Sequence, residues 1–341
     1  MIPIKGYATF DPLKHCWVGS GFKIDWFKDF PLGKSDKIMD PLKRISEETE
    51  EDYQQLLKIL KDANVQTYRT FYKPSIEWKD WHTNYGTAHP PICPRDDHAV
   101  IGEKFYNVGQ PLPRHNEIIE QINPNQVVHD DSSFFRLSTA NIVRVGKDIF
   151  WDINPDHIKW ENVKIQVEKY KQQWIDEGFR IHTSYRGYHS DGSFCVVKPG
   201  CIVSLYEVQD YAKEFPGWDI LYLPDQSWEK IRGFVNMRMK TGARWWLKGE
   251  EDNDELIEFV NTWLHDWVGY VEETVFDVNM LSIDQNTIIC NNYNKEVFDH
   301  FKKHKVEPII FNFRHRYFWD GGVHCITQDL YREGKMENYF E

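Results

Sequence analysis

The chain has 341 residues, of which 41% are hydrophobic and 15% aromatic, enough to bury a large core. Its formal net charge of −12 argues against nucleic acid or an anionic membrane surface as the main partner and favours cationic ligands. No stretch approaches the roughly 20 apolar residues of a membrane span, and the N-terminus does not resemble a secretion signal, so we expect a globular cytoplasmic protein.

One pattern recurs five times along the chain: an amphipathic run, a short turn, and a run in which apolar and polar residues alternate. Helical spacing followed by period-two alternation predicts a helix that leads into a strand. The five units lie at residues 56–71, 117–130, 170–185, 211–224 and 298–313. Pairs of β-rich runs with a turn signal between them predict hairpins at residues 97–108, 141–152, 194–206 and 278–290.

Repeated hairpin, helix and strand modules fit either an open α/β sheet or a closed ring of small blades, and the uneven spacing does not decide between them. No Ser-, Gly- or Pro-rich linker divides the repeats, so we predict a single domain over residues 1–341. The acidic run at residues 250–254 predicts a solvated loop or the first turn of a helix that carries Leu256, Phe259 and Val260.

The six cysteines, at positions 16, 93, 195, 201, 290 and 325, form no CxxC pair and show no spacing typical of a zinc site. A chain of this size needs no disulfide to hold its core together. We therefore expect reduced thiols and no bound metal.

Three segments place an ionisable group among turn residues next to a predicted strand, where a rigid scaffold holds reactive groups. Residues 90–97 read PPICPRDD, and the prolines stiffen the backbone before Asp96. Residues 189–194 read HSDGSF, and in an extended segment His189 and Asp191 would point to the same side. Residues 320–327 read DGGVHCIT, where paired glycines let the backbone turn tightly before Cys325.

Each segment alone has an ordinary interpretation: a turn with a surface ion pair for Pro-Arg-Asp, a loop hydrogen bond for His-x-Asp, and a buried structural thiol for the cysteine. Together they supply a cysteine, a histidine and carboxylates, the groups that nucleophilic catalysis uses when the fold brings them together. A metal site made of Cys325, His324, His189 and Asp191 has suitable ligand types, but no sequence spacing supports it.

Similarity to a known family runs through most of the chain, in the family's own order. The segments that carry it are FDPLKHCWVG at 10–19, PRD at 94–96, TANIVRVGKDIF at 139–150, HSDGSF at 189–194, KPGCIVS at 198–204 and GGVHCITQD at 321–329. On these motifs the sequence resembles the amidinotransferase family, within the guanidino-modifying enzymes that include arginine deiminases. The resemblance implies a five-bladed α/β propeller of the pentein type with its active site on the central axis, and the five units counted above agree with five blades.

The resemblance also implies roles for individual residues. Asp96 and Asp191 match the positions that bind a guanidinium, a planar cation that carboxylates hold through paired N–H bonds. Cys325 matches the nucleophile and His189 its acid–base partner. The implied reaction moves the amidino group of L-arginine through a covalent adduct on Cys325 to an amine acceptor, glycine in the best-known members, and gives ornithine and guanidinoacetate. It uses no cofactor and no metal, and family members are often homodimers.

The sequence departs from the family at two places. Ser138 stands where the family has an aspartate that orients the catalytic histidine, so its hydroxyl, or a carboxylate such as Asp130 or Asp131, would have to replace it. The arginine that binds the substrate carboxylate just after residues 198–204 is also absent, and Tyr206-Glu207-Val208 stands there.

Three functions remain open on the sequence. The first is an amidinotransferase, which the ordered motifs favour. The second is a hydrolase or deiminase of arginine or another guanidine that uses the same Cys–His site with water as the acceptor. The third is a non-catalytic guanidine-binding protein that lost turnover with the orienting aspartate.

Overall fold

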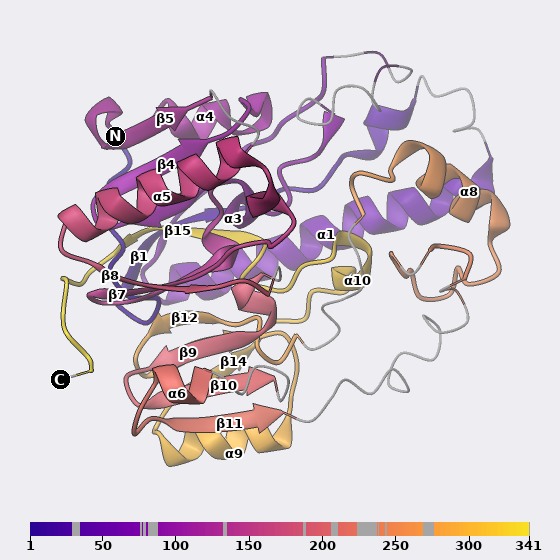
Figure 1. Cartoon of the computed structure of the whole chain (residues 1–341). Helices are drawn as coiled ribbons and strands as arrows, with labels where there is room; N and C mark the ends of the chain where they lie inside the picture. The colour runs from indigo at the N-terminus through magenta and orange to yellow at the C-terminus, as the bar shows by residue number, and fades with distance from the viewer. Residues whose placement is uncertain are drawn as a thin grey trace.

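The structure of the chain is a computed structural model (Figure 1). It describes residues 1–28, 35–75, 77, 80, 88–131, 135–186, 189–205, 211–223, 237, 239–242, 244–268 and 276–340, with only the backbone of residues 211 and 212. The segment Tyr206-Glu207-Val208, where the sequence lacks the expected arginine, lies outside the described residues.

Five sheets of three strands each make up the β-structure of the described residues. In four blades two strands form an antiparallel hairpin, and a third strand joins in parallel after a connecting segment, as in β6–β7–β8; in the fifth blade the antiparallel pair is β15 and β1. The parallel strand needs this crossover, because a tight turn joins only antiparallel strands. The strands are β1 Leu13–Val18, β2 Gln66–Tyr68, β3 Ala99–Ile101, β4 Lys104–Val108, β5 Val127–Asp130, β6 Ile142–Val145, β7 Asp148–Asp152, β8 Arg180–Ser184, β9 Phe194–Lys198, β10 Cys201–Leu205, β11 Asp219–Leu223, β12 Leu281–Asp284, β13 Thr287–Cys290, β14 Glu307–Ile310 and β15 Thr327–Arg332.

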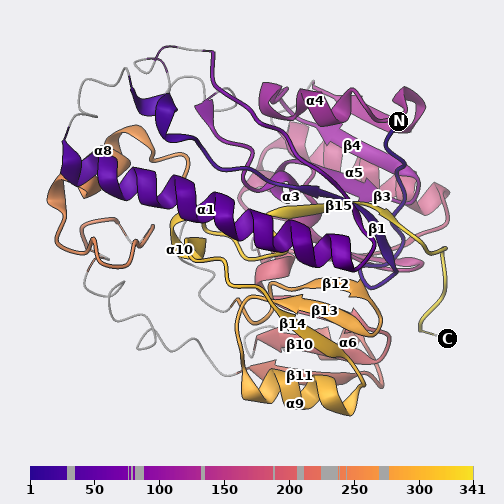
Figure 2. The same ribbon diagram turned by 180° about the vertical axis from the view of Figure 1, so that it is seen from behind.

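One sheet joins the two ends of the chain. β15 runs antiparallel to β1, with Thr327 opposite Val18, and β2 pairs in parallel with the other edge of β1. Figures 1 and 2 show β15 beside β1 from both sides. The predicted five-bladed α/β propeller is therefore confirmed, and so are the four predicted hairpins and the five helix-to-strand units.

Glycines close three of the predicted hairpins. Gly102, Gly146 and Gly200 have φ values of 59°, 66° and 81°, which residues with a Cβ adopt only at a cost. At Gly146 an added Cβ would also lie 2.2 Å from the carbonyl oxygen of Glu337. The turn signals in the sequence therefore correspond to backbone conformations that need glycine.

Several helices lie in the crossovers and contact the parallel strand that follows, as α1 contacts β2, α5 contacts β8 and α9 contacts β14, whereas α8 contacts α1. The longest is α1, whose apolar residues recur at helical spacing, so that Leu42, Ile45 and Leu56 are buried along one face. The predicted helix after the acidic run is α8. Asn253 caps its N-terminal end, because the side-chain oxygen of Asn253 accepts a hydrogen bond from the Leu256 amide at 3.1 Å. The helices are α1 Asp36–Asp62, α3 Pro94–Asp97, α4 Asn116–Ile119, α5 Glu161–Asp176, α6 Tyr211–Glu214, α8 Asp254–Trp263, α9 Lys295–Lys303 and α10 Arg316–Trp319.

An ionic network lies where the blades meet. Asp329 on β15 forms ion pairs with Arg95 at 2.9 Å, with Arg332 at 2.7 Å and with Arg144, and all four residues are buried. Burial acts to raise the pKa of Asp329, but the three guanidinium charges outweigh it and hold that pKa well below its usual value. The interpretation of Pro-Arg-Asp as a turn with a surface ion pair is therefore wrong, because Arg95 is fully buried and links two blades.

No helix within the described ranges has the length and hydrophobicity to span a membrane.

Candidate active site

The site is built from one position that repeats in every blade: the segment just before the first strand of the hairpin. Asp96 precedes β3, Ser138 precedes β6, Asp191 precedes β9, Asn279 precedes β12 and Cys325 precedes β15. Because the blades repeat around a ring, these five segments lead into equivalent strands. Hydrogen bonds join Asp191, Asn279 and Cys325 directly.

The thiol of Cys325 is buried between two polar side chains. Its Sγ lies 3.6 Å from Oδ2 of Asp191 and accepts a hydrogen bond from Nδ2 of Asn279 at 2.9 Å. Oδ1 of Asn279 accepts hydrogen bonds from the backbone amides of His324 at 3.0 Å and Cys325 at 3.4 Å. Asn279 therefore fixes both the backbone and the sulfur of the predicted nucleophile, although the sequence analysis did not single it out. Its place before a hairpin strand is the signal that would have found it.

The two glycines before Cys325 avoid a close contact that a Cβ at either position would make. The left-handed residue of this turn is Asp320, with a φ of 50°, and neither Gly321 nor Gly322 has a positive φ. A Cβ on Gly322 would lie 2.4 Å from Oδ1 of Asn279, and one on Gly321 would lie 3.1 Å from Sγ of Cys93. The predicted tight turn is present, but the reason for its glycines differs from the prediction.

A second histidine holds one of the predicted guanidinium-binding carboxylates. Nδ1 of His324 lies 2.7 Å from Oδ2 of Asp191. Burial lowers the pKa of His324 to about 4, so its ring is neutral at pH 7 and donates its Nδ1 proton to the carboxylate. Burial acts to raise the pKa of Asp191, but the hydrogen bond from His324 and the charges of His189 and Arg95 outweigh it, and that pKa lies below its usual value. Asp191 therefore stays ionised in the empty site.

Asp96 and His189 face each other across the site. Oδ1 of Asp96 lies 3.9 Å from Nδ1 of His189. Burial raises the pKa of Asp96 to about 7, and the charge of Asp191 adds to this shift while His189 opposes it. Burial acts to lower the pKa of His189, but the carboxylates of Asp96, Asp191 and Asp320 outweigh it and raise that pKa above its usual value. Asp96 therefore titrates near neutral pH, and the carboxylates favour the protonated form of His189.

The segment that carries His189 is a turn. Residues Ser190–Gly192 form a 3-10 helix that His189 precedes, so the extended conformation assumed from the sequence is wrong. The structure still brings His189 and Asp191 into one electrostatic cluster with Asp96.

The residues considered as replacements for the orienting aspartate have other partners. The hydroxyl of Ser138 donates to the carbonyl oxygen of Arg95 and accepts from the amide of Ala140, both at 3.1 Å, so it caps a short 3-10 helix, Thr139–Asn141. Oδ2 of Asp130 accepts from Lys169 at 2.6 Å and from Tyr170 at 3.0 Å on α5. Asp131 is exposed.

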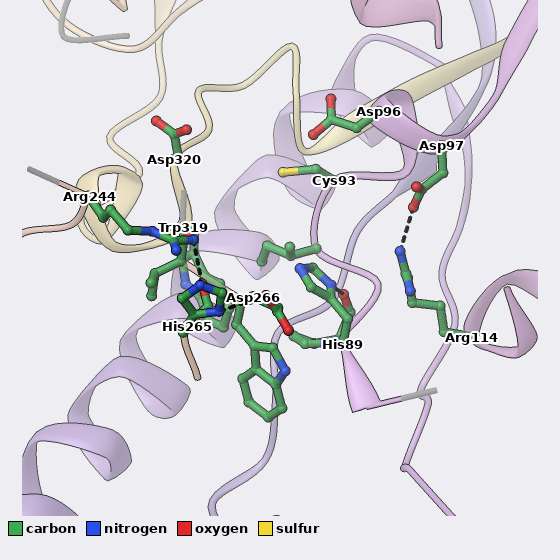
Figure 3. Close-up of a pocket in the computed structure, with 14 residues that line it drawn as sticks. His89, Cys93, Asp96, Asp97, Arg114, Arg244, His265, Asp266, Trp319 and Asp320 are labelled. Carbon is green, nitrogen blue, oxygen red and sulfur yellow. Dashed lines mark hydrogen bonds and ion pairs between the residues drawn. The ribbon is translucent and has the colours of Figure 1, made fainter. Parts of the chain in front are cut away.

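A pocket of about 380 Å³ opens beside Asp96 (Figure 3). Cys93, Asp96 and Asp320 line one part of it, and Figure 3 shows the thiol of Cys93 between these carboxylates and the rest of the pocket. The remaining wall is a mixture of charged and aromatic side chains, which includes Arg114, Arg244, His265, Asp266, Trp267 and Trp319. Its volume lies in the range of small-molecule sites.

Two buried carboxylate oxygens give the site its chemical character. Oδ1 of Asp96 and Oδ1 of Asp191 are each inaccessible to solvent and have no hydrogen-bond partner within the described part of the chain. A buried acceptor left without a donor is costly, so the site is suited to a ligand that brings N–H donors and positive charge. A thiol and an imidazole lie near these oxygens and are suited to attack such a ligand.

Comparisons with known proteins found relatives in sequence and in fold. No family model matches the chain. A curated L-arginine:L-lysine amidinotransferase from Pseudomonas savastanoi pv. phaseolicola is 21% identical over 209 residues, which cover 59% of this chain and 45% of that protein. The match therefore spans less than half the length of this relative.

Solved structures share the fold over nearly the whole chain. An amidinotransferase of saxitoxin biosynthesis from Microseira wollei superposes with a TM-score of 0.65 at 16% identity, over 99% of this chain and 100% of that one. Inosamine-phosphate amidinotransferase from Streptomyces griseus gives 0.63 at 14% identity, with 99% of both chains covered. Dimethylarginine dimethylaminohydrolase from Pseudomonas aeruginosa gives 0.55 at 12% identity, over 93% of this chain and 98% of that one.

The structure has a fold of the pentein class, an α/β propeller in which three segments that precede strands of different blades carry a cysteine, a histidine and two aspartates. Within that class the predicted resemblance is confirmed: the chain is similar to the amidinotransferases in sequence and in fold.

Proposed function

We propose that this protein is an amidinotransferase that moves the amidino group of L-arginine to a primary amine through a covalent adduct on Cys325. The observation that carries the proposal is the pair of buried, unpartnered oxygens on Asp96 and Asp191, one of which belongs to a carboxylate 3.6 Å from the thiol. A guanidinium supplies both the donors and the charge that these oxygens lack.

Binding comes first in the proposed mechanism. The guanidinium of arginine lies between Asp96 and Asp191 and donates to both, and its central carbon then faces Sγ of Cys325. Because Asp96 has a pKa of about 7 in the empty site, the bound cation draws it into the ionised form. Asp191 is held in place by His324 at 2.7 Å, so it meets the cation in a fixed orientation.

The first half-reaction forms the adduct. His189 takes the thiol proton, and the thiolate attacks the guanidinium carbon to form an S–C bond. The tetrahedral intermediate then collapses. His189 gives the proton to the nitrogen bonded to Cδ of the substrate, the bond from that nitrogen to the guanidinium carbon breaks, and ornithine leaves as an amine. A cationic amidino group remains on the sulfur, where Asp96 and Asp191 balance its charge.

The second half-reaction reverses these steps with a new amine. The amine attacks the amidino carbon, His189 takes one of its protons, and the C–S bond breaks to release thiolate and a new guanidino compound. His189 then returns its proton to the sulfur. No step requires a metal or an organic cofactor.

Glycine is the acceptor that the family resemblance predicts, and lysine is the acceptor in the name of the sequence relative. In a two-step exchange of this kind donor and acceptor occupy the same pocket in turn. The pocket of about 380 Å³ meets the proposed site at Asp96, although Cys325, His189 and Asp191 are not among its lining residues, and its volume would admit an acceptor larger than glycine. We propose a primary amine of an amino acid as the acceptor class, with glycine as the first candidate and lysine as the second.

Arg244 is the residue we propose for the substrate carboxylate, in place of the arginine missing after residue 204. It lines the pocket, and its Nη2 donates to the carbonyl oxygens of His265 at 2.5 Å and Val268 at 2.9 Å, which fixes the direction of the side chain. A guanidinium suits a carboxylate, because it presents its donors in one plane. Its loss should raise KM for arginine more than it lowers kcat.

Product analysis tests the reaction. The protein is incubated with arginine alone, with arginine and glycine, and with arginine and lysine, and ornithine, guanidino products, citrulline, urea and ammonia are quantified. Ornithine formed only when an amine is present, together with the matching guanidino compound, is the expected result. Citrulline, or sustained ornithine and urea without an amine, would instead identify a hydrolase. This is the second candidate, because dimethylarginine dimethylaminohydrolase shares the fold.

Variants test the nucleophile. Cys325→Ala should bind arginine but form no product, whereas Cys290→Ala, which changes another buried thiol, on β13, should keep turnover. In wild type, labelled ornithine should exchange into arginine without an acceptor, because the adduct is reversible. Equal turnover in wild type and Cys325→Ala would refute the assignment, and tight arginine binding with neither turnover nor exchange would identify a binding protein.

The cytoplasmic location, the single domain and the homodimer stay predictions. Their tests are fractionation of the native host, limited proteolysis and the mass of the protein in solution.

A further inference from the structure

A second cluster of reactive side chains lies away from the active site, between two neighbouring blades. Cys201 is the first residue of β10, His300 lies in the last turn of α9 in the next blade, and His304 follows the last residue of that helix as its C-cap. The ligand atoms of these three side chains all lie within 4.8 Å of one another. We propose that Cys201, His300 and His304 bind a zinc ion that links the two blades.

The elements place these residues together by their own geometry. Residue 201 is opposite residue 219 in the parallel pairing of β10 and β11, so Cys201 and Asp219 lie side by side at the start of their strands. Figures 1 and 2 both show α9 running along β11. Histidines four residues apart project from the same side of a helix, and the two imidazole rings lie 4.8 Å apart, centroid to centroid.

The distances suit a tetrahedral zinc ion. Zn–S bonds of about 2.3 Å and Zn–N bonds of about 2.0–2.1 Å place sulfur and nitrogen ligands about 3.6 Å apart. Sγ of Cys201 lies 3.4 Å from Nε2 of His300, close to that spacing. The ring of His304 is partly exposed, so its side chain can rotate and bring a ring nitrogen within bonding distance of the ion. Thiolate and imidazole ligands favour zinc over magnesium or calcium.

Asp219 supplies the outer support that histidine ligands usually have. Its Oδ2 lies 2.7 Å from Nε2 of His304 and 3.9 Å from Nδ1 of His300. A carboxylate on one ring nitrogen fixes the imidazole and leaves the other nitrogen for the ion. Lys303 also contacts Asp219, at 2.6 Å, and Nζ of Lys198 lies 3.4 Å from the carbonyl oxygen of His304. Because these two positive charges repel a divalent ion, binding of the ion depends on the negative charge of the Cys201 thiolate.

The site escaped sequence analysis because its cysteine lies about 100 residues from its histidines, while the His-x-x-x-His spacing of residues 300–304 was the local signal. Its proposed role is structural. The ion would fasten α9 to the β9–β10–β11 sheet, with the fourth ligand position taken by water. The proposal does not depend on the amidinotransferase reaction.

Cobalt and zinc titrations test it. The protein is stripped with a chelator and titrated in the Cys325→Ala background, so that the active-site thiol takes no part. One cobalt ion per chain, with the visible bands of tetrahedral cobalt and a thiolate-to-cobalt charge-transfer band, is expected. Competition with zinc gives the zinc affinity, and zinc should raise Tm.

Three variants and a control locate the ion. Cys201→Ser should abolish the charge-transfer band, and His304→Gln, at a partly exposed ring, should abolish the zinc-dependent rise in Tm. Asp219→Asn should weaken zinc affinity by about 10- to 100-fold, the usual effect of an outer carboxylate. Cys195→Ser, on the adjacent strand β9, should change none of these. Cobalt binding without the charge-transfer band, or zinc affinity unchanged in both Cys201→Ser and His304→Gln, would overturn the site.

Discussion

The pKa of Asp96 leads to the most direct test of the guanidinium site. Only the ionised carboxylate attracts the cation, and with a pKa of about 7 its ionised fraction falls about 10-fold between pH 8 and pH 6 and about 10-fold again by pH 5. Arginine affinity should fall in proportion. His189, whose pKa is raised by the same carboxylates, gains positive charge over this range and adds to the loss.

The assay is isothermal titration of arginine into Cys325→Ala, which cannot turn over, at half-unit steps from pH 8 to pH 5. Asp96→Asn in the same background should bind weakly at pH 8 and lose most of the pH dependence. Affinity that stays constant from pH 8 to pH 5 in the parent would refute the role of Asp96, and so would an unchanged slope in Asp96→Asn.

The same substitution has an opposite effect on stability. The folded pKa of Asp96, about 7, lies above the ordinary value of 3.8, so this group costs the empty protein stability as pH rises from about 4 to about 7. Asp96→Asn should therefore have a higher Tm than the parent at pH 8 while it loses arginine affinity. A lower Tm at pH 8 would mean that the ionised carboxylate has a structural partner.

Three further predictions concern the supports of the site. Gly322→Ala places a Cβ 2.4 Å from Oδ1 of Asn279 and should lower kcat and cost about 1–3 kcal/mol in urea unfolding, whereas Gly200→Ala, at an open hairpin turn, should leave kcat unchanged. Asn279→Ala removes the hydrogen bond to Sγ and both contacts to the backbone amides, so kcat should fall with little change in KM; a change in KM alone would contradict this. Asp329→Asn leaves three buried guanidinium groups without their shared carboxylate and should cost about 3–5 kcal/mol, while Glu333→Gln, in an exposed ion pair with Lys14, should shift unfolding by less than about 1 kcal/mol.

The site residues differ in whether a short motif in the sequence identifies them. Asp96, Asp191 and Cys325 stand in short motifs with turn residues around them, and the structure places the last two in contact. Asn279 was not singled out, and His324 was considered only as a metal ligand, because their partners lie on other blades: Asn279 and Cys325 are 46 residues apart, and His324 and Asp191 are 133 residues apart. Arg95 was assigned to the surface because a tripeptide does not reveal its own burial.

The sequence by itself determined the local elements: the hairpins, the helices that lead into strands, and the acidic start of α8. Periodicity and turn residues are sufficient for these, since each depends on neighbours within a few positions. Tertiary structure alone decided how the ring closes through β1 and β15, which arginines surround Asp329, and that Cys201 meets two histidines of the next blade. Residues this far apart in the sequence meet only when the blades pack against one another. Packing decides which side chains are buried and which groups lie close enough to interact.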